Sequence, residues 1–156
     1  MSGTNSRLVA DKIRAHHAAM VAQLSQSVSR VLDAVALANN WEPARQEVVA
    51  YIDQELLPHA VAEESTIYAS ARQFAPLRGL VASLIFEHVC LGRLRNALAV
   101  AQTGLEAVSL ASAFSHLFDV HAQKEDQFVV QDLENRVDVD LAGILGSMRQ
   151  LLSGAP

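Results

Sequence analysis

The sequence predicts an all-α protein, an up-down-up-down four-helix bundle followed by a short fifth helix. Apolar residues make up 51% of the chain and aromatic residues only 5%, a composition that favours packed helices over a β-sandwich. Apolar residues also recur every three or four positions along four long segments, as on one face of a helix. Because the connections between these segments are short, neighbouring helices are expected to be antiparallel.

Helix-breaking residues set the expected bounds of each element. Pro43 suits the first turn of the second helix, and Asp138 or Asp140 suits the N-cap of the fifth. Pro58 interrupts the second helix and should kink it or leave a π-bulge. We expect one domain over residues 1–156 with its core at about 7–135 and a disordered tail at 1–6. The expected helices cover about residues 7–38, 43–71, 76–104, 105–135 and 138–152.

Histidines and glutamates interrupt the apolar stripes of all four long segments. Burying an ionised carboxylate without a partner is costly, so such residues indicate a common partner inside the bundle. Measured from turns near residues 40, 74 and 104, they lie at one depth to within about four residues, or roughly 6 Å. The six residues are His17, His59, Glu63, His88, His121 and Glu125. The apolar stripe around them includes Ile13, Met20, Leu56, Leu84, Leu91, Phe114 and Phe128.

The spacing and chemistry of these six residues predict a metal site. His59 and Glu63 are four residues apart, as are His121 and Glu125, so each pair lies on one helix face. Imidazole and carboxylate together suit iron, manganese or zinc, and the set exceeds what one tetrahedral zinc needs. Two metals bridged by Glu63 and Glu125 would use all six ligands. We therefore expect two iron ions, ahead of manganese or zinc.

The ordered set resembles the hemerythrin-like HHE cation-binding family over about residues 7–133. That family has a histidine on helix one, H-x-x-x-E on helix two, a histidine on helix three and H-x-x-x-E on helix four. The stretch from Leu57 to Tyr68, with its double glutamate, is similar to the family's second helix. The resemblance implies a non-haem di-iron centre with an open position for a small ligand such as dioxygen, nitric oxide or peroxide.

The chain resembles the oxygen-carrying hemerythrins less closely. Those proteins have a second histidine four residues from the one on helix three, where this chain has Leu84 and Gly92. The missing histidine leaves the iron more open and favours sensing or redox chemistry. They also use H-x-x-x-x-D on helix four, so Asp126 competes with Glu125 for the bridging role, and Glu125 is preferred because it stays on the stripe.

Other polar residues near the predicted site are assigned less central places. His16 replaces His17 if the helical register is wrong by one residue, and His116 is expected at the surface. Tyr68 is interpreted as a core tyrosine. Glu64, Glu87 and Asp126 are expected to be solvated or to lie beside the ligating histidines.

Composition excludes several classes of function. The net charge of −5 without a Lys/Arg cluster argues against nucleic-acid binding, and the single cysteine, Cys90, excludes a disulfide framework. A polar start and the lack of a run of about 18 apolar residues predict a cytoplasmic protein without a membrane segment. We expect a di-iron protein that binds or senses a small ligand. The alternatives are a di-iron redox enzyme (peroxide decomposition or ferroxidase-type) and a structural bundle with a redox-silent metal. A protein partner or a homo-oligomer is compatible with each.

Overall fold

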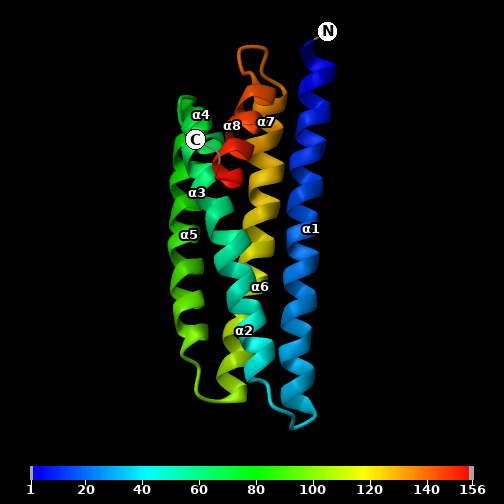
Figure 1. Ribbon diagram of the computed structural model, residues 1–156. Coiled ribbons are helices and arrows are strands. Elements are labelled where there is room, and N and C mark those ends of the chain that lie inside the picture. Colours follow the sequence, from blue (N-terminus) through cyan, green and yellow to red (C-terminus); the bar gives the residue numbers. More distant parts are fainter. Residues whose placement is uncertain (1, 155–156) are drawn as a thin grey trace.

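The computed structural model describes residues 2–154, which form a bundle of helices without strands (Figure 1). The predicted all-α class is confirmed. The segments called η are π-helical at Ile52–Leu56 and Glu125–Val130 and 3₁₀-helical at Ala75–Leu77. In chain order, the elements are α1 (Ser2–Ala36), α2 (Glu42–Tyr51), η1 (Ile52–Leu56), α3 (Leu57–Ser65), α4 (Ile67–Ala71), η2 (Ala75–Leu77), α5 (Arg78–Ala99), α6 (Gly104–Lys124), η3 (Glu125–Val130), α7 (Gln131–Glu134) and α8 (Leu141–Ser153).

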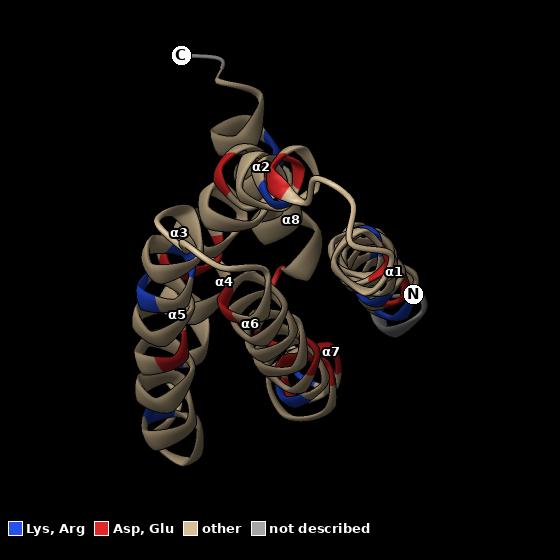
Figure 2. Ribbon diagram, turned by 90° about the horizontal axis from the view of Figure 1, so that it is seen from below, with Lys and Arg blue, Asp and Glu red and all other residues tan. Residues whose placement is uncertain are grey.

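The long segments pack side by side along one axis. Helix α1 contacts α2 and α6, and α5 contacts the same two helices. Figure 2 shows basic and acidic residues scattered over several helices, with no helix dominated by one sign. The segment Ala75–Ala99 is long and apolar enough to cross a membrane by length and composition, a test that core helices of soluble proteins also pass. Here it supplies one wall of the bundle.

The N-terminal residues differ from the expectation. Helix α1 begins at Ser2, so residues 2–6 are helical where a disordered tail was expected, and Met1 lies outside the described residues. Ser6, Val9 and Ala10 are buried. Tertiary packing therefore extends the helix to residues whose local sequence gives no strong helical signal.

Two π-helical segments adjust the register of the buried faces. Segment η1 ends two residues before Pro58, as predicted, and the Leu57 N–H donates to the Ile52 carbonyl, five residues back. Segment η3 was not predicted. Its wider turn places Val129 and Val130 in the core and leaves Phe128 54% exposed, so the assignment of Phe128 to the stripe was wrong.

The turns are fixed by local chemistry. Thr103 caps α6 in a reciprocal capping box with Glu106, and Asp140 caps α8 by accepting from the Gly143 N–H. A Cβ at Gly104 would come within 2.8 Å of Val35, so glycine allows the α5–α6 turn to pack against the end of α1. These caps agree with a fifth helix close to the predicted bounds.

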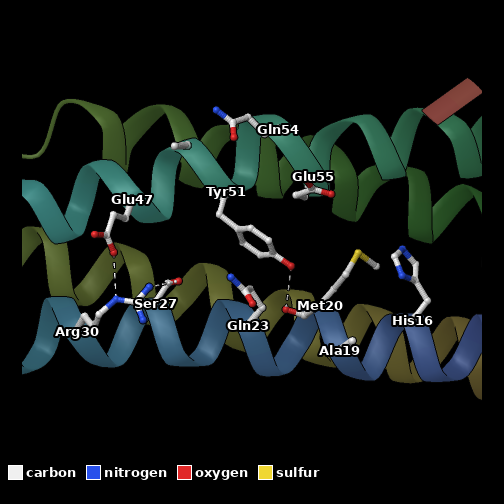
Figure 3. A pocket seen from close by; sticks show the side chains of 11 residues that line it. His16, Ala19, Met20, Gln23, Ser27, Arg30, Glu47, Tyr51, Gln54 and Glu55 are labelled. Atoms are coloured by element: carbon white, nitrogen blue, oxygen red, sulfur yellow. Dashed lines mark hydrogen bonds and ion pairs between the residues drawn. The ribbon is translucent and has the colours of Figure 1, made fainter. Parts of the chain in front are cut away.

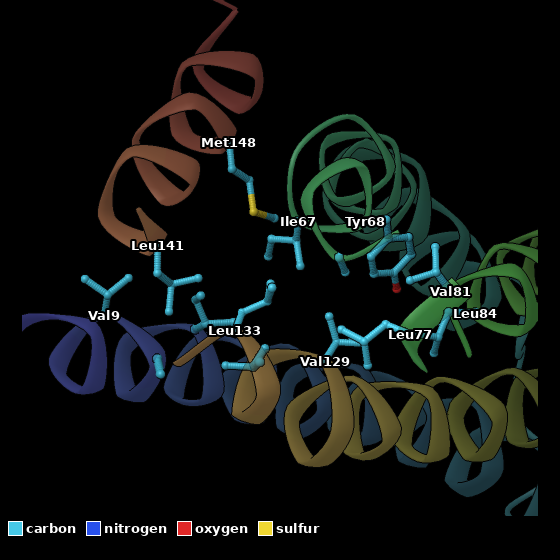
Figure 4. Close-up of a cluster of buried hydrophobic side chains, with 14 of the residues drawn as sticks. Val9, Ile67, Tyr68, Leu77, Val81, Leu84, Val129, Leu133, Leu141 and Met148 are labelled. Atoms are coloured by element: carbon cyan, nitrogen blue, oxygen red, sulfur yellow. The ribbon is translucent and has the colours of Figure 1, made fainter. Parts of the chain in front are cut away.

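The interior consists of two apolar clusters with a polar layer between them. One cluster contains Ile13, Leu84 and Val129 together with Leu141 and Met148 of α8 (Figure 4). The other contains Met20, Leu91 and Phe118. On α1, for example, His17 stands between Ile13 of one cluster and Met20 of the other, and on α5 His88 stands between Leu84 and Leu91 in the same way. The six side chains therefore share one layer of the bundle.

Candidate metal centre

All six predicted site residues are buried in this layer. His17 comes from α1, His59 and Glu63 from α3, His88 from α5, His121 from α6 and Glu125 from the first position of η3. None is more than 9% exposed. His16 and His116 are both exposed. Of the two adjacent histidines on α1, His17 is thus the one that faces the other site residues.

Two groups of donor atoms converge within the layer, and Glu63 belongs to both. In the first group, Glu63 Oε1 lies 2.7 Å from His59 Nε2 and 3.3 Å from His17 Nε2. In the second, the Nε2 atoms of His88 and His121 are 3.1 Å apart, and Glu63 Oε2 lies 3.6 Å from His88 Nε2. The carboxylate of Glu63 therefore directs one oxygen to each pair of histidines.

Glu125 is a buried carboxylate without a hydrogen-bond partner among the described residues. Neither of its oxygens has one, and Oε2 lies 3.8 Å from His17 Nε2. Burial and the neighbouring Glu63 raise the pKa of Glu125 well above its ordinary value. Burial also opposes ionisation of Glu63, but His59 and the other histidines hold the pKa of Glu63 well below its ordinary value. An unsatisfied carboxylate beside inward-facing imidazoles fits a bound cation, which would satisfy both.

Three of the histidines are oriented by carboxylates on their outer sides. The Nδ1–H groups of His17, His88 and His121 donate to Asp126 (2.7 Å), Glu64 (2.7 Å) and Glu87 (3.0 Å), respectively. Because a carboxylate only accepts, each of these histidines carries a proton on Nδ1, which leaves the inward Nε2 as the nitrogen that a metal would bind. The sequence held a signal for these partners, since each acid directly adjoins one of the six site residues. Asp126 binds the outer side of His17, away from the bridging place considered for it.

His59 is the exception. Its Nδ1 is buried and has no hydrogen-bond partner among the described residues. The ring of His16 lies beside it, with the two ring centroids 5.1 Å apart. His59 is therefore held by packing and by Glu63, without an outer carboxylate.

The electrostatic differences among the histidines do not follow the two pairs. Burial lowers the pKa of His88, but hydrogen bonds with Glu63 and Glu64 outweigh it and raise the pKa above its ordinary value. Burial lowers the pKa of His17, but hydrogen bonds with Asp126 and Glu63 outweigh it and raise the pKa well above its ordinary value. The pKa of His121 is lowered by burial and by the neighbouring His88. On the outer side of His121, Lys124 forms an ion pair with Glu87 and offsets its charge.

Tyr68 lies against the His88–His121 pair. The side chain is 1% exposed, its ring stacks on His88 at a centroid distance of 5.6 Å, and its hydroxyl lies 3.3 Å from His121 Nε2. Burial and the charge of Glu125 raise the pKa of Tyr68, so the phenol keeps its proton. The core assignment is consistent with this burial, and the tyrosine also lines the site.

Three cavities differ in their relation to the layer. An apolar cavity of about 10 Å³, close to the size of one water molecule, lies beside His59, Glu63 and His88 and is lined by Leu91 and Phe118, among other residues. A pocket of about 180 Å³ reaches His17 and His59 from the side of α8. A groove of about 630 Å³ lies between α1 and α2–η1 (Figure 3) and includes His16 but none of the six. The small cavity thus adjoins three of the six site residues, the pocket adjoins two and the groove adjoins none.

The comparisons with known proteins point to one family. The family model described as the hemerythrin HHE cation binding domain matches residues 8–133. No curated protein and no solved structure matches the chain. The matched range contains all six residues of the layer and the three outer carboxylates.

Proposed function

Because the chain belongs to the hemerythrin HHE cation-binding family, we propose that its buried layer holds a non-haem di-iron centre. In this proposal the protein binds or senses a small ligand such as dioxygen, nitric oxide or peroxide. When bound, such a centre supplies reversible redox chemistry and a position for a small ligand.

The proposal rests mainly on the two-sided contact of Glu63. One oxygen faces His17 and His59, and the other faces the His88–His121 pair. A carboxylate in that position suits a bridge between two cations. The four histidines would then be terminal ligands, and the unpartnered Glu125 would be the second bridge. The alternating directions of the long segments in Figure 1 support the up-down-up-down arrangement that lets four helices supply these ligands.

The surroundings of the layer support a small ligand. The cavity of about 10 Å³ beside His59 and His88 accommodates little more than a diatomic molecule. Phe114, Phe118 and Leu91 give it an apolar lining. On the other side of the layer, in the apolar cluster that contains Val129, the hydroxyl of Tyr68 keeps its proton next to His121 and offers a hydrogen-bond donor.

Metal analysis combined with an optical spectrum tests the proposal. Purified full-length protein should contain about two irons per chain and show an absorption band that changes reversibly with dioxygen or nitric oxide. His17→Ala should lose iron, whereas its neighbour variant His16→Ala should retain it, because His16 points outside the layer. Zinc, or no transition metal, in carefully prepared protein would refute the di-iron proposal.

One observation favours a second candidate, a di-iron redox enzyme. The protonated phenol of Tyr68 adjoins the site, and tyrosine can donate a proton to a reacting group. The enzyme hypothesis predicts that the wild-type protein consumes peroxide over many turnovers. It also predicts that Tyr68→Phe slows this consumption while the iron content stays unchanged. Reversible ligand binding without turnover supports the first.

A further inference from the structure

The pocket beneath α8 has apolar walls. It lies between α1, α3 and α8 and has a volume of about 180 Å³. Ile13 of α1 and Leu145, Met148 and Leu152 of α8 form much of its lining. This volume lies below the roughly 300–1,000 Å³ that is typical of sites for drug-sized ligands, so the pocket suits a smaller molecule.

The charged residues that line the pocket beneath α8 are all basic. Lys12 and Arg149 line the pocket together with three histidines, and none of the aspartates or glutamates in the described part of the chain lines it, although the net charge is −5. Within residues 2–154, neither cation takes part in any of the ion pairs or hydrogen bonds that the structure contains, whereas Arg14, Arg95 and Lys124 are all paired. Lys12 and Arg149 are therefore available to an anion.

One histidine that lines the pocket has a ring nitrogen without a hydrogen-bond partner. His59 is 4% exposed, lines the pocket and has no hydrogen-bond partner for its Nδ1 among the described residues. A ligand in this pocket would thus adjoin His59, whose other ring nitrogen, Nε2, contacts Glu63.

We propose that the pocket binds a small monocarboxylate with an apolar body. The carboxylate lies between Lys12 and Arg149, and the apolar body packs against Leu145 and Met148, next to His59. Charge-assisted hydrogen bonds to two cations supply the specificity for an anion, and burial of the body against α8 supplies the specificity for an apolar group. His17 and His59 line this pocket and also belong to the metal layer, so the two sites adjoin, but the contacts proposed for the carboxylate are with Lys12 and Arg149.

Calorimetric titration of full-length, metal-loaded protein tests the proposal with benzoate as the probe. We expect saturable benzoate binding, and much weaker binding of benzamide, which has the same shape without the charge. Lys12→Gln and Arg149→Gln should each weaken benzoate binding by about tenfold, since each removes one charge-assisted contact. Arg7→Gln, which removes an exposed cation from the same helix as Lys12, should leave binding unchanged.

Three outcomes would overturn this inference. The first is the absence of binding at millimolar benzoate, and the second is equal binding of benzamide. The third is benzoate binding that survives both cation variants but disappears when the metal is removed, because that pattern means direct contact with the metal. Met148→Trp should fill the pocket and abolish binding, with helicity measured by circular dichroism as the folding control. Metal content measured on the same samples keeps this result separate from the di-iron proposal.

Discussion

The two histidine pairs of the centre are built differently. His88 and His121 are held by Glu64 and Glu87 on their outer sides, and Tyr68 packs across both rings. In the other pair, His17 has an outer carboxylate in Asp126, but His59 has none, and both residues line the pocket beneath α8.

The two pairs of histidines therefore differ in how firmly the protein fixes their orientation. A histidine whose outer nitrogen is fixed keeps its tautomer and its direction, so the His88–His121 pair is preorganised. The His17–His59 pair is less constrained and lies nearer to a pocket that a molecule from solvent can enter. We expect metal to be held more firmly at the first pair and exchanged more readily at the second.

Removal of the residue that joins the two pairs should have the largest effect. Glu63→Ala deletes the one carboxylate that faces both, so iron content should fall from about two per chain to near zero. Elemental analysis of purified protein measures this change. Glu55→Ala, an exposed glutamate of the neighbouring turn, should retain both irons. Loss of only one iron from the Glu63 variant would show that the pairs bind metal independently.

Removal of an outer carboxylate should have the next largest effect. Such partners typically contribute about 10–100-fold to metal affinity, so Glu87→Ala should weaken binding at the His88–His121 pair by that factor. Asp126→Ala should do the same at the His17–His59 pair. Competition with a chelator measures both affinities. Asp119→Ala on α6 serves as the control, since Asp119 forms no hydrogen bond or ion pair with any of the four histidines in the described structure. Equal affinity in all three variants would contradict a role for the outer carboxylates.

Leucine substitutions of two glutamates should change the free energy of unfolding of the metal-free protein in opposite directions. Glu125→Leu removes a buried carboxylate without a partner and should stabilise the metal-free protein by about 1–3 kcal/mol. Glu87→Leu removes the partner of His121 and Lys124 and should destabilise it. Urea denaturation gives both free energies of unfolding. A loss of stability in the Glu125 variant would mean that this carboxylate has a partner even without metal.

The smallest expected effect concerns Tyr68. Tyr68→Phe deletes one hydroxyl and its long hydrogen bond to His121, which should cost about 1 kcal/mol of folding stability. Iron content should stay at the wild-type level because no metal ligand is lost. Thermal unfolding together with elemental analysis checks both statements, and a drop in iron content would place Tyr68 among the ligands.

The fold and the inward-facing residues could be predicted from the sequence because both follow from helical periodicity. Steps of three and four residues placed His17, His59, Glu63, His88, His121 and Glu125 among apolar neighbours, and all six are buried together. The same rule failed at Phe128, because the π-helical segment η3 adds a residue to the turn and rotates everything after it. It also failed at residues 2–6, where packing of Ser6 and Val9 decides that the chain is helical.

What the sequence determined by itself is therefore the set of buried polar residues and the depth they share, since a helix repeats regularly and a buried charge needs a partner. Only the tertiary structure decided how each of them is supported. Which acid meets which imidazole depends on how neighbouring helices are rotated against each other. The same holds for the surroundings of His59, which are fixed where α8 packs beside α1 and α3. Contacts between segments far apart in the chain have no local repeat from which they could be read.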